Sequence, residues 1–230
     1  MWNRQQVKEQ AKQIMKRNYW KMFVVTLLTG ILTGGKTTII ERVQDFASNN
    51  LSYDAQPIFY SSNFQYIFYS FISVASILGI LYTIFIGNII VVGKNGYFIK
   101  NHDENPELGE IFKGFKGNYL NVVKIMFLMD LKTLLWLFLF IVPGVIKAYE
   151  YSMIPYLLAE NPNLSADEAF SLSKQMTTGQ KMDLFVLDLS FIGWIILGLI
   201  CCGIGILFVL PYPEATRAEV YLNLKESVEI

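Results

Sequence analysis

The longest uncharged stretch of this chain limits what the chain can fold into. Residues 66–92 contain no Asp, Glu, Lys or Arg and are rich in Ile, Phe, Tyr and Val. A helix of about 20 such residues crosses the hydrocarbon of a bilayer, whereas a soluble surface helix has a polar face. Only 17% of the whole chain is charged, below the roughly 25% that is usual for soluble domains. The sequence therefore predicts an integral membrane protein.

Five further apolar runs predict additional spans. The six runs cover residues 22–35, 66–92, 119–142, 145–158, 182–200 and 204–221. A Pro-Gly pair at 143–144 separates the third run from the fourth, and 201–203 separates the fifth from the sixth, so we expect a tight hairpin at each. Pro211 and Pro213 should kink the last helix. We therefore expect an all-α, polytopic helical bundle of about six spans with interfacial amphipathic helices.

The segment before the first apolar run, residues 3–17, predicts a basic amphipathic helix. Its apolar positions recur at helical spacing, at Val7, Ala11, Ile14 and Met15. Its basic residues occupy other faces, at Arg4, Lys8, Lys12 and Lys16. Such a helix is suited to the surface of an anionic membrane. The alternative is an ordinary solvated helix.

The distribution of basic residues predicts the orientation in the membrane. With the N-terminus inside, the outer segments hold only Lys36 and Arg42. The inner segments hold Arg4, Lys8, Lys12, Lys16, Arg17, Lys21, Lys94, Lys100, Lys113, Lys116, Lys174, Lys181, Arg217 and Lys225. By the positive-inside rule, we expect a multi-pass protein of the bacterial cytoplasmic membrane with both termini in the cytoplasm. No small-residue cleavage pattern follows the first apolar run, so we expect no cleaved signal peptide.

Short repeated strings suggest how the chain is organised. We interpret 1–230 as a single membrane domain: an N-terminal helix (1–18), a first hairpin (19–92) with an outer loop (36–65), a second unit (93–158) and a third unit (159–230). ENPEL at 104–108 resembles ENPNL at 160–164, and KRNYW at 16–20 resembles KGNYL at 116–120. Chance similarity is the alternative. Ser165 and Glu168 form a capping-box pattern that predicts a helix start after the second ENP string.

Charged residues inside the apolar runs are the candidate site. Asp130, Lys132, Glu150 and Asp188 are the four intramembrane polar positions of greatest interest. A charge in hydrocarbon must face protein, water or a partner charge. One interpretation is an ion or substrate path, and the other is buried ion pairs that fix helix register. Lys132 and Glu150 are the pair we expect, whereas the sequence assigns no partner to Asp130 or Asp188.

Other chemistry has little support in the sequence. The string from Gly30 to Thr37 matches the phosphate-binding pattern G-x-x-x-x-G-K-[ST], but an apolar membrane-suited run follows in place of alternating strands and helices. Adjacent Cys201 and Cys202 and the single histidine, His102, have no metal-ligand spacing. We therefore expect no catalytic, cofactor-binding or metal site, no nucleotide, and, at zero net charge, no nucleic acid.

Four strings are distinctive: NYWK at 18–21, PGVIKAYEYSMIPYLLAENPNLSADEAF at 143–170, LDLSFIGW at 187–194 and LPYPEAT at 210–216. They resemble a bacterial family of multi-pass membrane proteins, the domain-of-unknown-function (DUF) 975 family. The resemblance implies a polytopic membrane protein and carries no functional residues. Three functions are open: a non-enzymatic scaffold or accessory module for a membrane protein partner or a second copy, a small transporter, and an enzyme acting on lipid or nucleotide. We favour the first and expect the lipid bilayer as a partner in every case.

Overall fold

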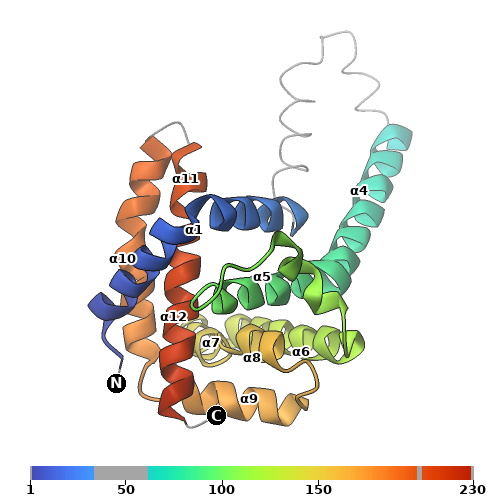
Figure 1. Ribbon diagram of the computed structural model, residues 1–230. Helices are drawn as coiled ribbons and strands as arrows, with labels where there is room; N and C mark the ends of the chain where they lie inside the picture. The colour runs from blue at the N-terminus through green and yellow to red at the C-terminus, as the bar shows by residue number, and fades with distance from the viewer. Residues whose placement is uncertain (1, 34–61, 201–203, 229–230) are drawn as a thin grey trace.

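The described residues fold entirely into helices. The computed structural model describes residues 2–33, 62–200 and 204–228, and no strand occurs among them (Figure 1). This confirms the predicted all-α class over those residues. The outer loop at 36–65 lies almost wholly outside the described residues, as do Lys36, Cys201 and Cys202.

The helices follow one another with short connections. They are α1 (Arg4–Leu32), α4 (Ser62–Tyr82), the π-helical turn η2 (Thr83–Gly87), α5 (Asn88–Lys100), the 3₁₀ helix η3 (Leu108–Phe115), α6 (Tyr119–Leu139), α7 (Ile141–Glu150), α8 (Ile154–Glu160), α9 (Ala166–Thr177), α10 (Lys181–Ile200), α11 (Ile204–Val209) and α12 (Pro211–Ser227). In Figure 1, α5 lies in the middle of the body and α4 extends away from it. Among the described residues, two helical stretches are long and apolar enough to cross a bilayer, Tyr69–Lys100 and Lys181–Ile200.

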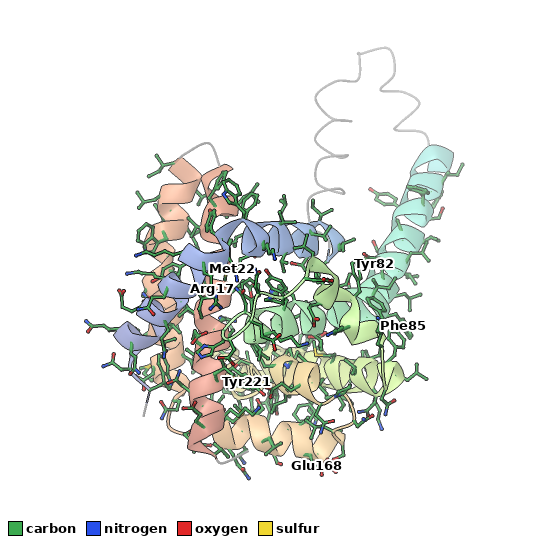
Figure 2. The ribbon with its side chains drawn as sticks, in the orientation of Figure 1. Arg17, Met22, Tyr82, Phe85, Glu168 and Tyr221 are labelled. Atoms are coloured by element: carbon green, nitrogen blue, oxygen red, sulfur yellow. The ribbon has the colours of Figure 1, made fainter. Side chains whose placement is uncertain are left out.

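Helix α1 is bent at Asn18, where it crosses the body of the protein. Asn18 leaves helical geometry (φ −132°, ψ 25°), and its amide donates to Asn101 Oδ1 at 2.7 Å. Arg17 Nη2 donates to the carbonyl oxygens of Asn101 at 2.5 Å and His102 at 2.9 Å. Figure 2 shows Arg17 and Met22 on either side of this bend. The bend therefore fixes α1 to the end of α5.

The apolar face of the first half of α1 is covered by protein. Val7, Ala11 and Ile14 are buried in one core cluster with Tyr97 of α5 and Ala218 of α12. The predicted apolar face is therefore correct, and protein covers it; the location of the basic faces at a membrane surface stays a prediction. The face packs against α12, which sequence periodicity alone could not indicate.

The hairpin of α6 and α7 turns earlier than predicted. The turn residue is Phe140, which is extended (φ −154°, ψ 134°), and Pro143 and Gly144 lie inside the first turns of α7. Proline is tolerated there because the first N–H groups of a helix have no helical acceptor. A Cβ on Gly144 would lie 2.6 Å from Leu137 Cα, so this glycine lets α7 approach α6 closely.

Two predicted spans are divided. The run 145–158 forms α7 and the separate, buried helix α8, so the prediction of one spanning helix there is wrong. With 10 residues, α7 rises about 15 Å, half the thickness of the hydrocarbon. The run 204–221 breaks between Val209 and Pro211, which agrees with the predicted kink. The proline at the first position of α12 lacks the N–H that would continue the helix from α11.

Helix α5 and η3 pack with backbone against backbone. A Cβ on Gly93 would lie 1.8 Å from the carbonyl oxygen of Ile111, and one on Gly114 would lie 2.7 Å from the carbonyl oxygen of Ile89. Both neighbours are buried. Glycine at these two positions therefore allows η3 to lie directly on α5.

We expect Gly93→Ala to destabilise the protein, because the new methyl group must displace the Ile111 backbone; overpacking of this kind costs about 1–3 kcal/mol or more. Gly79→Ala is the matched control, because no other atom lies within 4 Å of the place that its new methyl group would take on α4. The readout is the unfolding temperature of each purified variant in neutral detergent. A Gly93→Ala protein as stable as Gly79→Ala would contradict the packing of η3 on α5.

Candidate functional site

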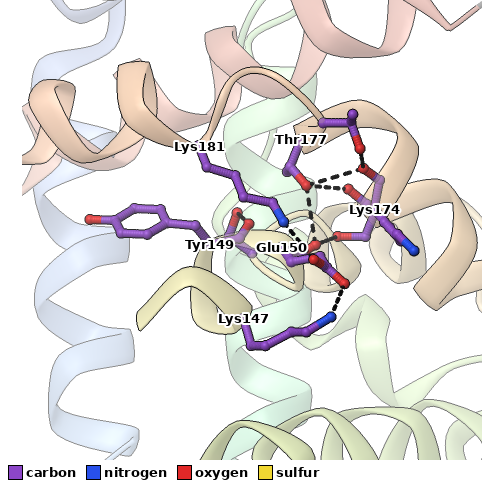
Figure 3. A network of polar contacts seen from close by, with 9 residues as sticks. Lys147, Tyr149, Glu150, Lys174, Thr177 and Lys181 are labelled. Carbon is purple, nitrogen blue, oxygen red and sulfur yellow. Dashed lines mark hydrogen bonds and ion pairs between the residues drawn. The ribbon is translucent and has the colours of Figure 1, made fainter. Parts of the chain in front are cut away.

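Glu150 is a buried carboxylate held by two lysines at the end of α7 (Figure 3). Its Oε1 accepts from Lys147 Nζ at 2.7 Å, and its Oε2 accepts from Lys181 Nζ at 2.5 Å. The Glu150 carbonyl oxygen accepts from Ser173 Oγ at 2.7 Å. The contacts connect α7 to α9 and to the start of α10. Both carboxylate oxygens and the carbonyl are thus used within the protein.

The predicted pair of Lys132 and Glu150 is wrong. Lys132 Nζ lies 3.7 Å from the centre of the Phe170 ring, in a cation–π contact. Glu150 is occupied by lysines from its own helix and from α10. Lys147 lies three residues before Glu150 on α7, so it reaches the carboxylate without leaving its helix.

Asp188, which had no partner in the sequence, forms an ion pair with α12. Arg217 Nη2 donates to Asp188 Oδ2 at 2.6 Å, and Arg217 Nε donates to Oδ1 at 3.3 Å. Tyr149 also donates its hydroxyl to Asp188 Oδ2 at 2.9 Å. The carboxylate thus joins α10 to α7 and α12. A guanidinium that binds both oxygens fixes orientation as well as neutralising charge.

Asp130, which is exposed on α6, lines a pocket with three other charged side chains on its wall, which we call the polar pocket. The pocket has a volume of about 500 Å³ and is lined by side chains of α5, α6, α7, α8 and α12. Asp130 Oδ2 accepts from the amide of Asn88 at 2.8 Å. Lys94 Nζ and Glu214 Oε1, also on the pocket wall, pair at 2.5 Å, and Arg217 closes another side. The two acids of the pocket wall therefore differ: Asp130 accepts from a neutral amide, whereas Glu214 is paired with a lysine.

The polar pocket contains residues that the sequence did not single out. Lys94 and Arg217 were expected only as basic residues of inner segments, and Glu214 was not considered. Lys94 lies just beyond the end of an apolar run, so its signal was weak. Arg217 and Glu214 are three residues apart on α12, so helical spacing could have placed them on one face.

The four predicted positions do not form one site. Asp130 lines the pocket, Asp188 pairs with a residue on its wall, Glu150 lies in the separate lysine pair, and Lys132 contacts Phe170. Among the described residues, no group of three or more His, Cys, Asp or Glu could hold a metal ion. The segment before the phosphate-loop string is helical, since α1 extends to Leu32, whereas a phosphate loop follows a strand.

One family model matches the second half of the chain. Residues 141–228 match the model of a family described as "Protein of unknown function (DUF975)". The match confirms the family resemblance and covers α7 to α12, which include Glu150, Asp188 and Arg217. No match was found among curated proteins or among solved structures.

We expect Arg217→Met to lower stability by about 1.5–3 kcal/mol, because Asp188 then keeps its charge without a cation. The double variant Asp188→Asn/Arg217→Met should recover part of this loss, because no lone charge is left. Arg4→Met, at an exposed position, is the control for loss of one arginine. The unfolding temperature in neutral detergent is the measurement. Additive losses in the double variant would contradict a direct interaction.

Proposed function

We propose that this protein is a non-enzymatic, multi-pass module of the bacterial cytoplasmic membrane that scaffolds or assists a membrane protein partner. The observation that carries this proposal is the contrast between the paired charges of the body and the bare apolar surface of α4. Glu150, Asp188 and Glu214 each bind a basic side chain, so the body uses these charges to hold its own helices together.

Helix α4 supports both the membrane location and the partner. Its large apolar side chains are exposed around much of its circumference: Tyr66, Ile67, Tyr69, Phe71, Val74, Ile77, Leu78, Ile80, Leu81 and Tyr82. A helix that is apolar on all sides requires lipid or protein around it. Figure 2 shows Tyr82 where α4 meets the body, and its hydroxyl donates to the carbonyl of Leu32 at 2.5 Å. The rest of α4 therefore offers a long surface for a neighbour.

The apolar hairpin ends support a multi-pass arrangement. Phe138 is 92% exposed at the end of α6, and Ile141 is 75% exposed at the start of α7. Leu197 and Ile200, towards the end of α10, are exposed in the same way. In the proposed arrangement all six apolar runs enter the bilayer, although α7 alone is too short to cross it.

Contacts between inner segments support the proposed orientation with both termini in the cytoplasm. Tyr221 and Lys225, near the C-terminus, both bind Glu160, which ends α8. Arg17 binds the loop after α5. Each of these contacts joins segments that the positive-inside rule assigns to the same side.

The proposed internal repeat is supported by matching contacts. Lys21, after KRNYW, donates to Asn105 of ENPEL at 2.7 Å. Asn121, after KGNYL, donates to the carbonyl oxygens of Pro162 and Leu164 in ENPNL at 3.0 and 2.7 Å. The residue that directly follows each string thus binds the ENP loop of the next unit. Repetition of this contact between a string and an ENP loop suits a scaffold in which similar loops hold similar hairpins.

The turns after the two ENP loops also match. Gly117, before α6, has φ +94°, and Gly179, before α10, has φ +77°. Ser165 and Glu168 form the predicted capping box, and these hydrogen bonds to Ser165 hold the pKa of the Glu168 carboxyl below its ordinary value. The second and third units therefore each pass from an ENP loop through a short helix and a left-handed glycine into a long apolar helix.

We expect photo-crosslinking residues at Ile77 or Ile80 on α4 to give a protein adduct of defined mass in living cells, because both side chains are exposed. The same residue at Asp167, exposed on α9, is the control for contacts outside α4. Adducts are detected by gel shift and identified by mass spectrometry. Adducts with lipid alone at both α4 positions would contradict a partner on this helix.

Transport is a second candidate function, and the polar pocket favours it. Asp130 lines a pocket of about 500 Å³ and is bound by a neutral amide, so its charge is available to a cation or to a polar substrate. Such intramembrane carboxylates occur on ion and proton paths. The pocket volume lies within the range of about 300–1,000 Å³ that is usual for ligand sites.

If transport is the function, Asp130→Asn should abolish the phenotype that the wild-type gene restores to a deletion strain while the protein level stays normal. Asn keeps the shape of Asp and removes the charge that would bind a cation. Asp183→Asn, exposed at the start of α10, is the matched control and should restore the phenotype fully. Full restoration of the phenotype by Asp130→Asn would exclude a transport path that needs the Asp130 carboxylate. A lowered protein level would show that Asp130 contributes to stability.

A further inference from the structure

An apolar groove lies where the first half of α1 crosses α10, α11 and the start of α12. Its volume is about 450 Å³. The walls are formed by Met15 and Tyr19 of α1, Trp194 of α10, Phe208 of α11 and Tyr212 of α12. In Figure 1 these four helices meet on one side of the body, away from α4. The groove is therefore separate from the polar pocket around Asp130.

Contacts within the protein hold the walls of the groove in place. The Tyr19 hydroxyl donates to the Phe208 carbonyl at 3.0 Å, and the Phe208 ring stacks on Phe23 with centroids 5.0 Å apart. The Tyr212 ring meets the edge of Phe191 at 5.2 Å. A groove formed by side chains that are already ordered loses little conformational entropy when a ligand binds.

The rim of the groove is basic. Lys12 and Lys16 are four residues apart on α1, so they lie on one face of the helix, and both are exposed. Lys12 pairs with Glu9 at 2.8 Å. Lys16 forms no hydrogen bond or ion pair with any residue in the described ranges. One positive charge therefore remains free beside an apolar wall.

We propose that this groove binds one anionic phospholipid of the cytoplasmic leaflet. One of its two acyl chains lies between Trp194 and Phe208, the other stays in the bilayer, and its phosphate lies at Lys16 and Lys12. The two parts of the site match the two parts of this ligand: an apolar chain needs the groove, and a phosphate needs the lysines. Tyr and Trp favour the boundary between hydrocarbon and headgroups, and basic pockets between membrane helices bind anionic headgroups. The proposal rests on the membrane location proposed above.

The surroundings of the groove favour a lipid over a folded partner. Ile196 and Leu197, just beyond Trp194 on α10, are 51% and 57% exposed. In a bilayer these side chains face acyl chains, so a lipid reaches the groove laterally without leaving the hydrocarbon. The exposed apolar surface of α10 thus continues into the groove. In the proposed arrangement Lys12 and Lys16 lie at the end of the groove that faces the lipid headgroups.

The test uses the full chain purified in neutral detergent, with dioleoyl phosphatidylglycerol and dioleoyl phosphatidylcholine as probes. We expect phosphatidylglycerol to bind in native mass spectra and to raise the unfolding temperature, and phosphatidylcholine to do neither. Lys12→Gln/Lys16→Gln should weaken phosphatidylglycerol binding about 30-fold, since each lysine near an anionic headgroup contributes about 1 kcal/mol. Lys116→Gln/Lys174→Gln removes the same charge at exposed positions away from the groove and should bind as the wild type does.

Soluble glycerol phosphate separates a lipid site from a simple phosphate site. It should not compete with phosphatidylglycerol at equal concentration, because it has no chain to fill the groove. Equal binding of both lipids, competition by glycerol phosphate, or the same loss in both double variants would overturn the proposal. Extraction of cell membranes with alkaline carbonate distinguishes a missing lipid site from a missing membrane location. A chain released into the supernatant would overturn the membrane location itself.

Discussion

Charge that is removed from water must be neutralised nearby, and this requirement connects the helices of the body. Glu150 joins α7 to α10 through Lys181, Asp188 joins α10 to α12 through Arg217, and Lys94 joins α5 to α12 through Glu214. Glu150 is buried, so leaving its charge unpaired would cost several kcal/mol, whereas the pairs of Asp188 and Glu214 are partly exposed and contribute less. The ion pairs therefore specify which helices are neighbours, while the apolar contacts around them supply most of the attraction.

Local signals in the sequence predicted the parts of the fold that depend on local chemistry. The capping box of Ser165 and Glu168 begins α9 as predicted, and the break before Pro211 lies where the proline removes an N–H. The hydrophobic runs correctly indicated helices throughout the described residues. These features need only a few neighbouring residues, so they can be predicted without knowledge of the tertiary structure.

The predictions that failed depend on how helices pack. The turn before α7 lies at Phe140, and Gly144 lies inside α7, where it allows close contact with Leu137 of α6. Lys132 was expected to pair with Glu150, yet Lys181, which binds this carboxylate, comes from a later helix. The apolar face of α1 suits lipid and protein equally well, so its contact with α12 could not be predicted from helical spacing. For the candidate site, sequence identified Asp130 and Asp188 but could not assign Asn88 or Arg217 to them.

Paired charges thus hold the helices of the body together, whereas α4, the hairpin ends and the groove beside α1 expose apolar side chains. The most direct test is the accessibility of spin labels in lipid nanodiscs, with Cys201 and Cys202 replaced by Ser and a single label at position 77, 197 or 167. Labels at 77 and 197 should collide more often with oxygen than with a water-soluble nickel complex, and the label at 167 should do the reverse. Equal access of the nickel complex to all three positions would contradict the membrane embedding on which the account depends.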